Sequence, residues 1–353
     1  MWQGMAHGFA VGIDENGLGP RLGPLVVTSI LARTSTDETR DGEKVANARP
    51  KGALRKRLGD SKKLVSFGDS ALGEAWARAL LRRAGEVEPA AVDELVHALA
   101  LDPRTELRAP CPDAHADQCW SAEGERYLAE PKLLAQLARD LDRLAAAGVE
   151  ILRARVAIVC TKRLNEATVS GRSRFQVDLH AMERLVLRAR ADAGADVAAV
   201  CGKVGGFDRY VEHFGPLGGR PCVAVREGRA RSTYAVPGVG TIAFVRDADA
   251  SNLLVCLASL VGKWVRDLLM TRIVRYHRAH DPGLPDASGY HDPITTRFVA
   301  ASALSRARRQ LPDACFERTS LEREAALAEA TSSRRPPPPS SPARKARSRS
   351  ATP

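Results

Sequence analysis

Apolar residues follow two periods along the chain, and these predict short strands that alternate with long helices. Runs rich in Val, Ile and Leu, bounded by Gly, Pro or polar residues, are typical of strands. Such runs lie within 9–28, at 149–160 and 195–201, and as three short segments in 219–246. Helical spacing appears at 70–83 and 132–147, around Met182, within 244–270, and from about Pro293. This alternation is compatible with an α/β fold, and it suits several folds of that class equally.

The first strand pair carries the most suggestive chemistry. The stretch 9–28 reads as a β-hairpin in which an apolar run ends at the adjacent carboxylates Asp14 and Glu15. A turn with glycines at 17, 19 and 23 follows. Two carboxylates at a strand end, beside a turn thin enough to admit a polymer backbone, can hold a divalent metal ion or accept a proton. Adjacent strand residues point to opposite faces, so both acids share one site only if the strand ends or twists there. The plainer interpretation is an ordinary acidic turn.

Two segments are less regular than the rest. Residues 34–58 are polar and charged and are expected to form a loop, whereas 86–131 is interpreted as an insertion. This insertion places Cys111, His115 and Cys119 at a spacing of four, with Asp113 and Asp117 nearby. These residues could supply three soft zinc ligands, but a structural zinc site normally has four. An ordered loop is therefore the favoured interpretation.

Composition limits the class of protein. The length of 353 residues and the 44% hydrophobic content suit a packed core, as two modest domains or as one core with insertions. No apolar run reaches about 18 residues, so no membrane span is expected. The first residues lack the basic and apolar regions of a secretory signal. Seven scattered cysteines fit a reducing compartment, so the predicted location is the cytoplasm.

The net charge of +11 is divided unevenly along the chain. Residues 331–353 hold six Arg or Lys and no acid, which leaves +5 for the rest. A run of four prolines among Ser and Arg predicts a disordered basic tail over 331–353. Excess positive charge suits a polyanionic partner such as nucleic acid.

Several motifs, in order along the chain, indicate a family. VGIDENGLGPRLGPLVV at 11–27 resembles the opening motif of the type 2 ribonucleases H (ribonuclease HII and its relatives), which pairs Asp-Glu with a Gly-Arg-Gly-Pro turn. Asp60–Leu64 matches the Asp-Ser-Lys-Lys-Leu segment of that family, and Ser288-Gly289-Tyr290 resembles its Gly-Tyr element. Further matches fall at Asn165, Ala181 and Met182, and at Ala258, Ser259, Lys263, Arg266 and Asp267.

The resemblance implies the ribonuclease H fold, a mixed five-stranded sheet flanked by helices, with insertions and a C-terminal helical part. It places one domain at 1–330, with the helical part at 279–330, and a monomer is expected. The implied reaction is hydrolysis of the RNA strand in RNA/DNA hybrids, or at ribonucleotides in duplex DNA, with two Mg²⁺ or Mn²⁺ ions. The implied metal ligands and catalytic residues are Asp14, Glu15 and Asp249. Asp247 is the alternative to Asp249, since Asp249 could be the N-cap of a helix. The implied nucleic-acid contacts are Gly17, Leu18, Gly19, Lys62, Lys63 and Tyr290.

Two departures from the family pattern stand out. A third catalytic Asp is expected after the strand at 195–201, where this chain has Cys201 and Gly202. A thiolate is a poor ligand for Mg²⁺, and Asp208 is the nearest acid that could replace the missing one. Leu18 occupies the place of the arginine in the turn. Two hypotheses remain: an active nuclease with a rearranged ligand set, and a nucleic-acid-binding protein that keeps the fold without turnover.

Overall fold

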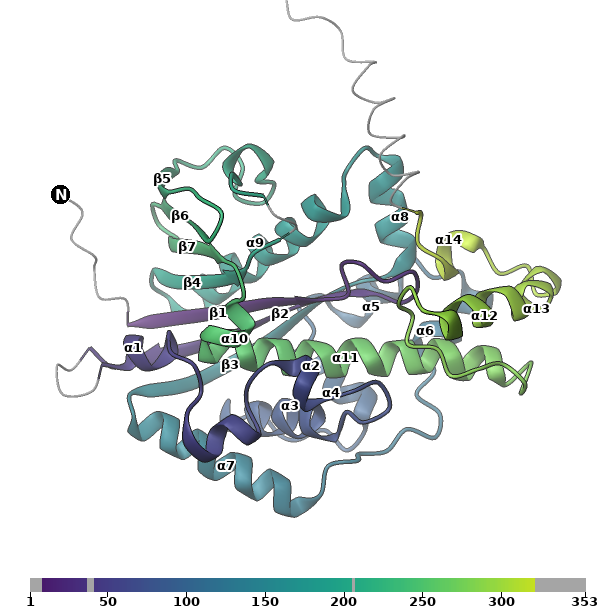
Figure 1. The fold of residues 1–353 in the computed structure, drawn as a ribbon, viewed down its shortest axis with the longest axis horizontal. Helices are drawn as coiled ribbons and strands as arrows, with labels where there is room; N and C mark the ends of the chain where they lie inside the picture. Colours follow the sequence, from purple (N-terminus) through teal and green to yellow (C-terminus); the bar gives the residue numbers. More distant parts are fainter. Residues whose placement is uncertain (1–7, 37–40, 205–206, 321–353) are drawn as a thin grey trace, which may run out of the picture.

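A mixed seven-stranded sheet forms the centre of the protein (Figure 1). The computed structural model describes residues 8–36, 41–204 and 207–320. The strand order is β3-β2-β1-β4-β7-β6-β5. β4 runs parallel to β1 and to β7, and the other pairs are antiparallel. The strands are β1 (Phe9–Asn16), β2 (Leu25–Thr34), β3 (Val149–Val159), β4 (Val197–Gly202), β5 (Val223–Arg226), β6 (Arg231–Val236) and β7 (Gly240–Val245).

The α/β class and the mixed sheet flanked by helices agree with the prediction, but the expected count of five strands is wrong. Strands β1 to β4 and β7 make a five-stranded mixed sheet, and β6 and β5 extend it beyond β7. The apolar pattern itself indicates seven strands, because all three short segments of 219–246 join the sheet. The resemblance, rather than the pattern, is the source of the lower number.

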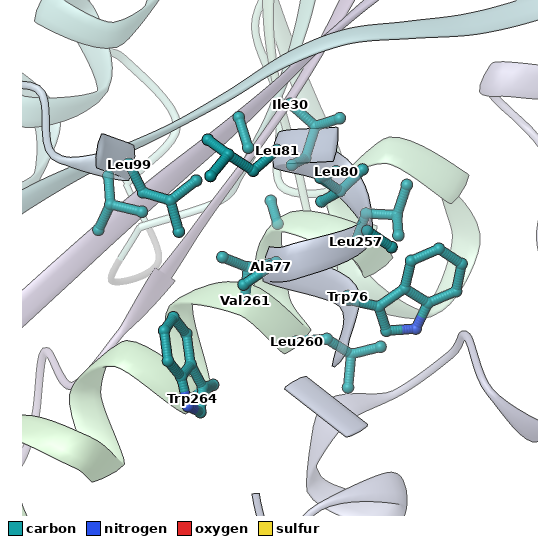
Figure 2. Packing of buried hydrophobic residues seen from close by; sticks show 14 of the residues in the cluster. Ile30, Trp76, Ala77, Leu80, Leu81, Leu99, Leu257, Leu260, Val261 and Trp264 are labelled. Atoms are coloured by element: carbon teal, nitrogen blue, oxygen red, sulfur yellow. The ribbon is translucent and has the colours of Figure 1, made fainter. Parts of the chain in front are cut away.

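One face of the sheet is covered by α11 (Leu253–Arg278), which packs on β1 and β2. A Cβ atom at Gly12 would lie only 2.3 Å from the backbone of Leu254, so the close approach of α11 to β1 requires glycine there. Beside α11, α3 (Ala71–Arg83) and α7 (Pro131–Ala146) pack on β3 and on each other (Figure 1). Figure 2 shows Leu257, Leu260 and Val261 of α11 facing Trp76 and Ala77 of α3.

The opposite face is covered by α9 (Arg174–Ala193), whose Leu179, Met182 and Leu185 pack against Ile13 of β1. Burying each such side chain contributes about 1.5–3 kcal/mol relative to leaving it exposed. The position of Met182 in this core agrees with the helix expected around it. The glycine at the helix end, Gly194, has a φ of 67°, a left-handed conformation that favours glycine and ends the helix.

A third core joins the C-terminal helices to the turn after β1. Phe298 and Phe316 pack with Leu22 of this turn and with Met270 of α11. The helices of this part are α12 (Pro293–Ala301), α13 (Ala303–Arg308) and α14 (Asp313–Phe316). In Figure 1 they lie beside the C-terminal half of α11. The predicted disordered tail at 331–353 lies outside the described residues.

The two segments expected to be irregular contain helices. Residues 34–58 include α1 (Gly42–Ala46) and η1 (Gly52–Lys56), so the expectation of a simple loop is wrong. Leu95 and Trp120 of segment 86–131 are buried in the core beneath the sheet. That this segment is an insertion stays a prediction. Its elements are α4 (Val92–Leu99), α5 (Arg104–Arg108), η2 (Asp113–His115) and α6 (Asp117–Trp120); the remaining ones of the chain are α2 (Ser61–Leu64), α8 (Thr161–Val169), η3 (Val211–His213) and α10 (Ala248–Ser251).

Within the described ranges, no helix combines the length and the apolar character that crossing a bilayer requires.

Candidate active site

A cleft of about 350 Å³ lies where β1 and β4 end. It brings together Asp14, Glu15 and Asp249, which are about 235 positions apart in the sequence. The other residues that line it are Asn16, Gly17, Leu18, Gly19, Pro20, Ser61, Lys62, Gly202, Lys203, Arg246, Asp247, Ala248, Ser259, Lys263 and Tyr290. Of the metal ligands and nucleic-acid contacts that the resemblance implies, only Lys63 is missing from this lining.

Asp14 is the most deeply placed acid of the cleft. Its pKa is raised well above the usual range, chiefly because burial disfavours the charged form and also because the carboxylates of Glu15 and Asp249 are near. The hydroxyl of Ser259 opposes this shift. Ser259 is in turn 2.9 Å from the Ser61 hydroxyl, so α11 and α2 jointly position the group that faces Asp14. Three like charges that converge in this way favour a cation between them.

Glu15 lies on the opposite face of β1 from Asp14. Gly12, Asp14 and Asn16 face α11, whereas Ile13 packs on α9, so alternation directs Glu15 toward α9. Both acids still reach one cleft because β1 ends at Asn16. Burial raises the pKa of Glu15, and the N–H of Leu18, which donates to Glu15 Oε2 at 3.0 Å, opposes that shift.

Asp249 lies in the short helix α10, directly before α11. It is not the N-cap of the long helix, since Asn252 takes that role and its Oδ1 accepts from the Val255 N–H at 3.0 Å. Burial raises the pKa of Asp249, and the nearby Lys62 ammonium opposes the shift. The alternative residue, Asp247, also lines the cleft, but its side chain is 82% exposed and faces Arg246 at 3.8 Å. Asp249 is therefore the better-placed acid.

Cys201 and Gly202, at the end of β4, are the two positions at which the resemblance places a third carboxylate. Cys201 is buried on the α9 side, whereas Gly202 lines the cleft. A Cβ atom at Gly202 would lie 2.8 Å from Asp14 Oδ1. A side chain at position 202, and not at 201, would therefore meet Asp14.

Asp208 does not fill this gap. Its Oδ1 accepts from Lys203 Nζ at 2.7 Å, and it does not line the cleft. Lys203 Nζ also donates to the carbonyl of Gly228 at 2.8 Å, so the pair is fixed toward the β5–β6 turn. The suggestion that Asp208 replaces the missing acid is thus not supported by its placement.

Carboxylate oxygens are the donors that Mg²⁺ and Mn²⁺ prefer, so the chemistry of Asp14, Glu15 and Asp249 fits a hard divalent ion. As the side chains of the described residues are placed, no three His, Cys, Asp or Glu could hold a metal ion together. These three acids would have to draw closer around a cation, and Gly202 contributes no donor atom. The donor set fits one ion more readily than two.

The turn after β1 and Tyr290 also line the cleft. Gly17 has a φ of 96°, and a Cβ atom there would lie 2.8 Å from Arg266 Nε, so both conformation and space require glycine. Nothing lies within 4 Å of a Cβ atom built at Gly19, so that side of the turn is open. Tyr290 is 44% exposed, and the guanidinium of Arg266 lies 4.4 Å from its ring centroid.

Of the two lysines expected to contact nucleic acid, only Lys62 lines the cleft. Lys63 is 82% exposed and lies 3.5 Å from Asp60 at the surface.

One acid was missed by the sequence analysis. Asp178 of α9 is fully buried, and neither carboxylate oxygen has a hydrogen-bond partner among the described residues. Burial raises its pKa well above the usual range, with further contributions from Glu15 and Asp14. A signal was present, because Asp178 precedes Met182 and Leu185 at helical spacing and so falls on the apolar face of its helix.

The proposed zinc ligands Cys111, His115 and Cys119 line a separate small cavity, together with Cys160 and Cys315. No three of them are placed to hold a metal ion. Cys111 Sγ instead accepts from the indole N–H of Trp120 at 3.3 Å, and His115 Nδ1 lies 3.4 Å from the Tyr276 hydroxyl. The placement of these residues does not support a zinc site.

Comparison with family models and with curated protein sequences finds no match to this chain. Among solved structures, it is similar to a chain of the PCNA:RNase HII complex from Archaeoglobus fulgidus, with 17% identity and a TM-score of 0.40, over 89% of this chain and 99% of that one. The ribonuclease H2 from Pyrococcus horikoshii OT3 shows 15% identity and a TM-score of 0.38, over 91% and 98%. Bst-RNase HIII in complex with Mn²⁺ shows 15% identity and a TM-score of 0.41, over 93% and 71%. All three carry names from the group of ribonucleases H that the sequence motifs resemble.

Proposed function

We propose that this protein is a divalent-metal-dependent endonuclease that hydrolyses the RNA strand of RNA/DNA hybrids, or cuts at ribonucleotides within duplex DNA. The observation that carries the proposal is the convergence of Asp14, Glu15 and Asp249 in one cleft with the glycine turn and Tyr290. An acidic cluster would repel a polyanion unless a cation lay between them. The motif resemblance at 11–27 and 60–64 points to the same chemistry.

In this proposal the acids act as ligands. Asp14, Glu15 and Asp249 would hold Mg²⁺ or Mn²⁺, which when bound activates water and stabilises the leaving oxygen. Lys62 lines the cleft and would offset phosphate charge, whereas Lys263 Nζ donates to Asp267 at 2.9 Å. The open side of the turn at Gly19 lets backbone groups approach a ribose, where the 2′-hydroxyl distinguishes RNA from DNA. Tyr290 would stack on a sugar or base beside the cut.

A second function is favoured by one specific observation. Gly202 supplies no carboxylate where one would meet Asp14, and the cleft lining includes Lys62, Lys203, Arg246 and Lys263. Lys203 is paired with Asp208 and Lys263 with Asp267, so Lys62 and Arg246 are the cations of this lining that would meet a phosphate. Such a cleft would bind a nucleic-acid backbone with little turnover.

The full chain is incubated with a labelled RNA/DNA hybrid and with duplex DNA that contains one ribonucleotide, each in Mg²⁺ or Mn²⁺. Cleavage that is lost in Asp14→Asn and kept in Cys201→Ala would support the nuclease. Tight binding without cleavage in either metal would instead support the binding protein. If the protein neither binds nor cleaves these substrates, both proposed functions are contradicted.

A further inference from the structure

The turn that borders the cleft is held from inside by an arginine near the end of the described chain. We propose that Arg318 positions the 17–23 turn, so that a buried guanidinium from the C-terminal segment orders the part of the cleft that meets the ribose. This inference rests on the proposed nuclease function, because it concerns how the same cleft is shaped. No local sequence pattern marks Arg318, and Leu18 leaves the turn itself without an arginine between Gly17 and Gly19.

One guanidinium binds both ends of the turn. Arg318 Nη1 donates to the carbonyl oxygens of Gly17 at 2.7 Å and Leu18 at 3.2 Å. Its Nε and Nη2 donate to the carbonyl of Gly23 at 2.9 and 2.7 Å. The planar guanidinium fixes the relative positions of these three acceptors. A lysine ammonium has no such fork.

The segment that delivers Arg318 is itself firmly attached. The N–H of Arg318 donates to the carbonyl of Arg21 at 3.1 Å, and Leu22 and Glu317 form an isolated β-bridge. Asn165 of α8 fixes the same segment from the other side. Its Nδ2 donates to the carbonyls of Ala314 at 3.0 Å and Glu317 at 2.9 Å, and its Oδ1 accepts from the Thr319 N–H at 2.8 Å.

The electrostatic setting of Arg318 is unusual for a cation. Its side chain is buried, and among the described residues its side-chain hydrogen bonds go to carbonyls and to no carboxylate. Burial, together with the charges of Arg174 and Arg266, lowers the pKa of Arg318 to about 9. Burying a cation without an ion pair costs free energy. The hydrogen bonds from the Arg318 guanidinium to the carbonyls of the turn offset part of that cost.

The turn needs such support because of its composition. Gly17 and Gly23 have φ values of 96° and 83°, and glycine loses more conformational entropy on ordering than any other residue. The N–H of Leu18 donates to Glu15, so disorder in the turn would also release a carboxylate of the cleft. Arg318 is thus a positioning residue, which acts through the backbone of the turn.

The test compares the full-length protein with Arg318→Met, Arg318→Lys and the matched control Glu317→Gln, which lies outside the turn. Arg21 Nε forms a partly exposed ion pair with Glu317 at 2.5 Å, so the control loosens the same segment without removing the guanidinium under the turn. Amide hydrogen exchange over 17–23 is measured without metal. Binding of a duplex with one ribonucleotide is measured in EDTA, kcat and KM are measured with Mn²⁺, and Tm is recorded for each variant.

We expect exchange over 17–23 to rise about tenfold or more in Arg318→Met and Arg318→Lys, with weaker binding of the ribonucleotide duplex. We expect kcat/KM to fall about 100-fold, the scale of a misplaced reacting group. Glu317→Gln should change each quantity less than about twofold, since such partly exposed pairs are weak. Unchanged exchange and binding in a folded Arg318 variant would overturn the inference.

If Arg318→Met is unfolded, Arg318→Lys decides the outcome. Unfolding of both variants would overturn the inference in favour of a purely structural role. Exchange and EDTA binding do not require turnover, so a wild-type protein that binds but does not cleave would contradict the nuclease and leave the positioning of the turn measurable.

Discussion

The ends of β1 and β4 lie side by side in the sheet, with Ile13 opposite Cys201, yet they contribute very differently to the cleft. The β1 end carries Asp14 and Glu15, and the Leu18 N–H and the Ser259 hydroxyl contact those acids. The β4 end carries Gly202, and the residue after it, Lys203, turns to Asp208 and the Gly228 carbonyl.

Under the proposed function, this difference indicates which side of the cleft would hold a cation. Carboxylates that share a cation must be close enough to repel one another without it. That relation holds between Asp14, Glu15 and Asp249, whereas the β4 end takes no part in it. The acids of the cleft therefore lie at the β1 end and not at the β4 end. Substitutions at the two ends should change activity and metal affinity by different amounts and in different directions.

The largest effect is expected at the β1 end. Asp14→Asn removes the charge that the other two acids face, and loss of a catalytic ligand should lower kcat/KM about 10³-fold or more. Initial rates on the hybrid in Mn²⁺ measure the loss. Asp208→Asn is the matched acid beyond the β4 end, and it should leave the rate within about twofold. Equal losses in the two variants would remove the distinction between the strand ends.

The next largest effect, expected at the β4 end, is a gain in metal affinity rather than a loss of activity. Gly202→Asp adds a carboxylate beside Asp14 and should tighten Mn²⁺ binding about 10- to 100-fold, measured by calorimetry and by the metal-induced rise in Tm. Without metal the same variant should melt lower, because two acids then repel and Asp14 must move from the new Cβ atom. Gly202→Ala introduces that Cβ atom alone, so it should lower Tm without improving affinity. Equal metal binding in both variants would contradict the assignment of the lost carboxylate to position 202.

The contrast between the strand ends was only half visible in the sequence. Asp14 and Glu15 sit in a contiguous motif, so their location at a strand end next to a turn could be predicted from local pattern. The choice between Cys201 and Gly202 could not, because it depends on which face of β4 each residue occupies. The face that each residue occupies is fixed by where β4 ends and by the register of β4 with β1. Both depend on the tertiary structure.

Residues whose role depends on distant contacts were missed altogether. Arg318 reaches Gly17 across 301 positions, and no local pattern marks it. The burial of Asp178 depends on where α9 packs, although its helical spacing with Met182 gave a hint. The helices within 34–58 and 86–131 were overlooked because they are short and their apolar faces complete only when packed on the body.

Asp178 offers a third test, because it lies on the α9 side beneath both strand ends, near Glu15 and Cys201. Asp178→Asn removes a buried carboxyl group that has no hydrogen-bond partner in the described part of the chain. On folding at pH 7 this group must either bury its charge or take up a proton, so the substitution should raise the free energy of unfolding by about 2 kcal/mol. The pKa of Asp178 is higher in the folded state than in the unfolded one, so the folded state binds the extra proton. Asp178 therefore destabilises the folded state at pH values above its pKa in the unfolded chain. In more acidic solution this destabilisation is absent.

The increase in the free energy of unfolding caused by Asp178→Asn should accordingly shrink as pH falls from 7 toward 4. Denaturant titrations at each pH measure this change. Asp142→Asn serves as control, since Asp142 is an exposed acid paired with Arg83 at 2.7 Å, and its change should stay near zero at every pH. A loss of stability in Asp178→Asn at pH 7 would show that the carboxylate has a partner that stabilises it.

The smallest effect is expected at Tyr290, which lines the cleft without touching its acids. Its ring rests on Arg266, so Tyr290→Ala removes a stacking surface and should raise KM for the ribonucleotide duplex about tenfold, with kcat little changed. Tyr290→Phe keeps the ring and should behave like the wild type within about twofold, because stacking needs the aromatic face rather than the hydroxyl. Steady-state kinetics on the two variants separate these cases. A larger loss in Tyr290→Phe than in Tyr290→Ala would mean that the hydroxyl, rather than the ring, contacts the substrate, and the cleft would then recognise a polar group at that wall.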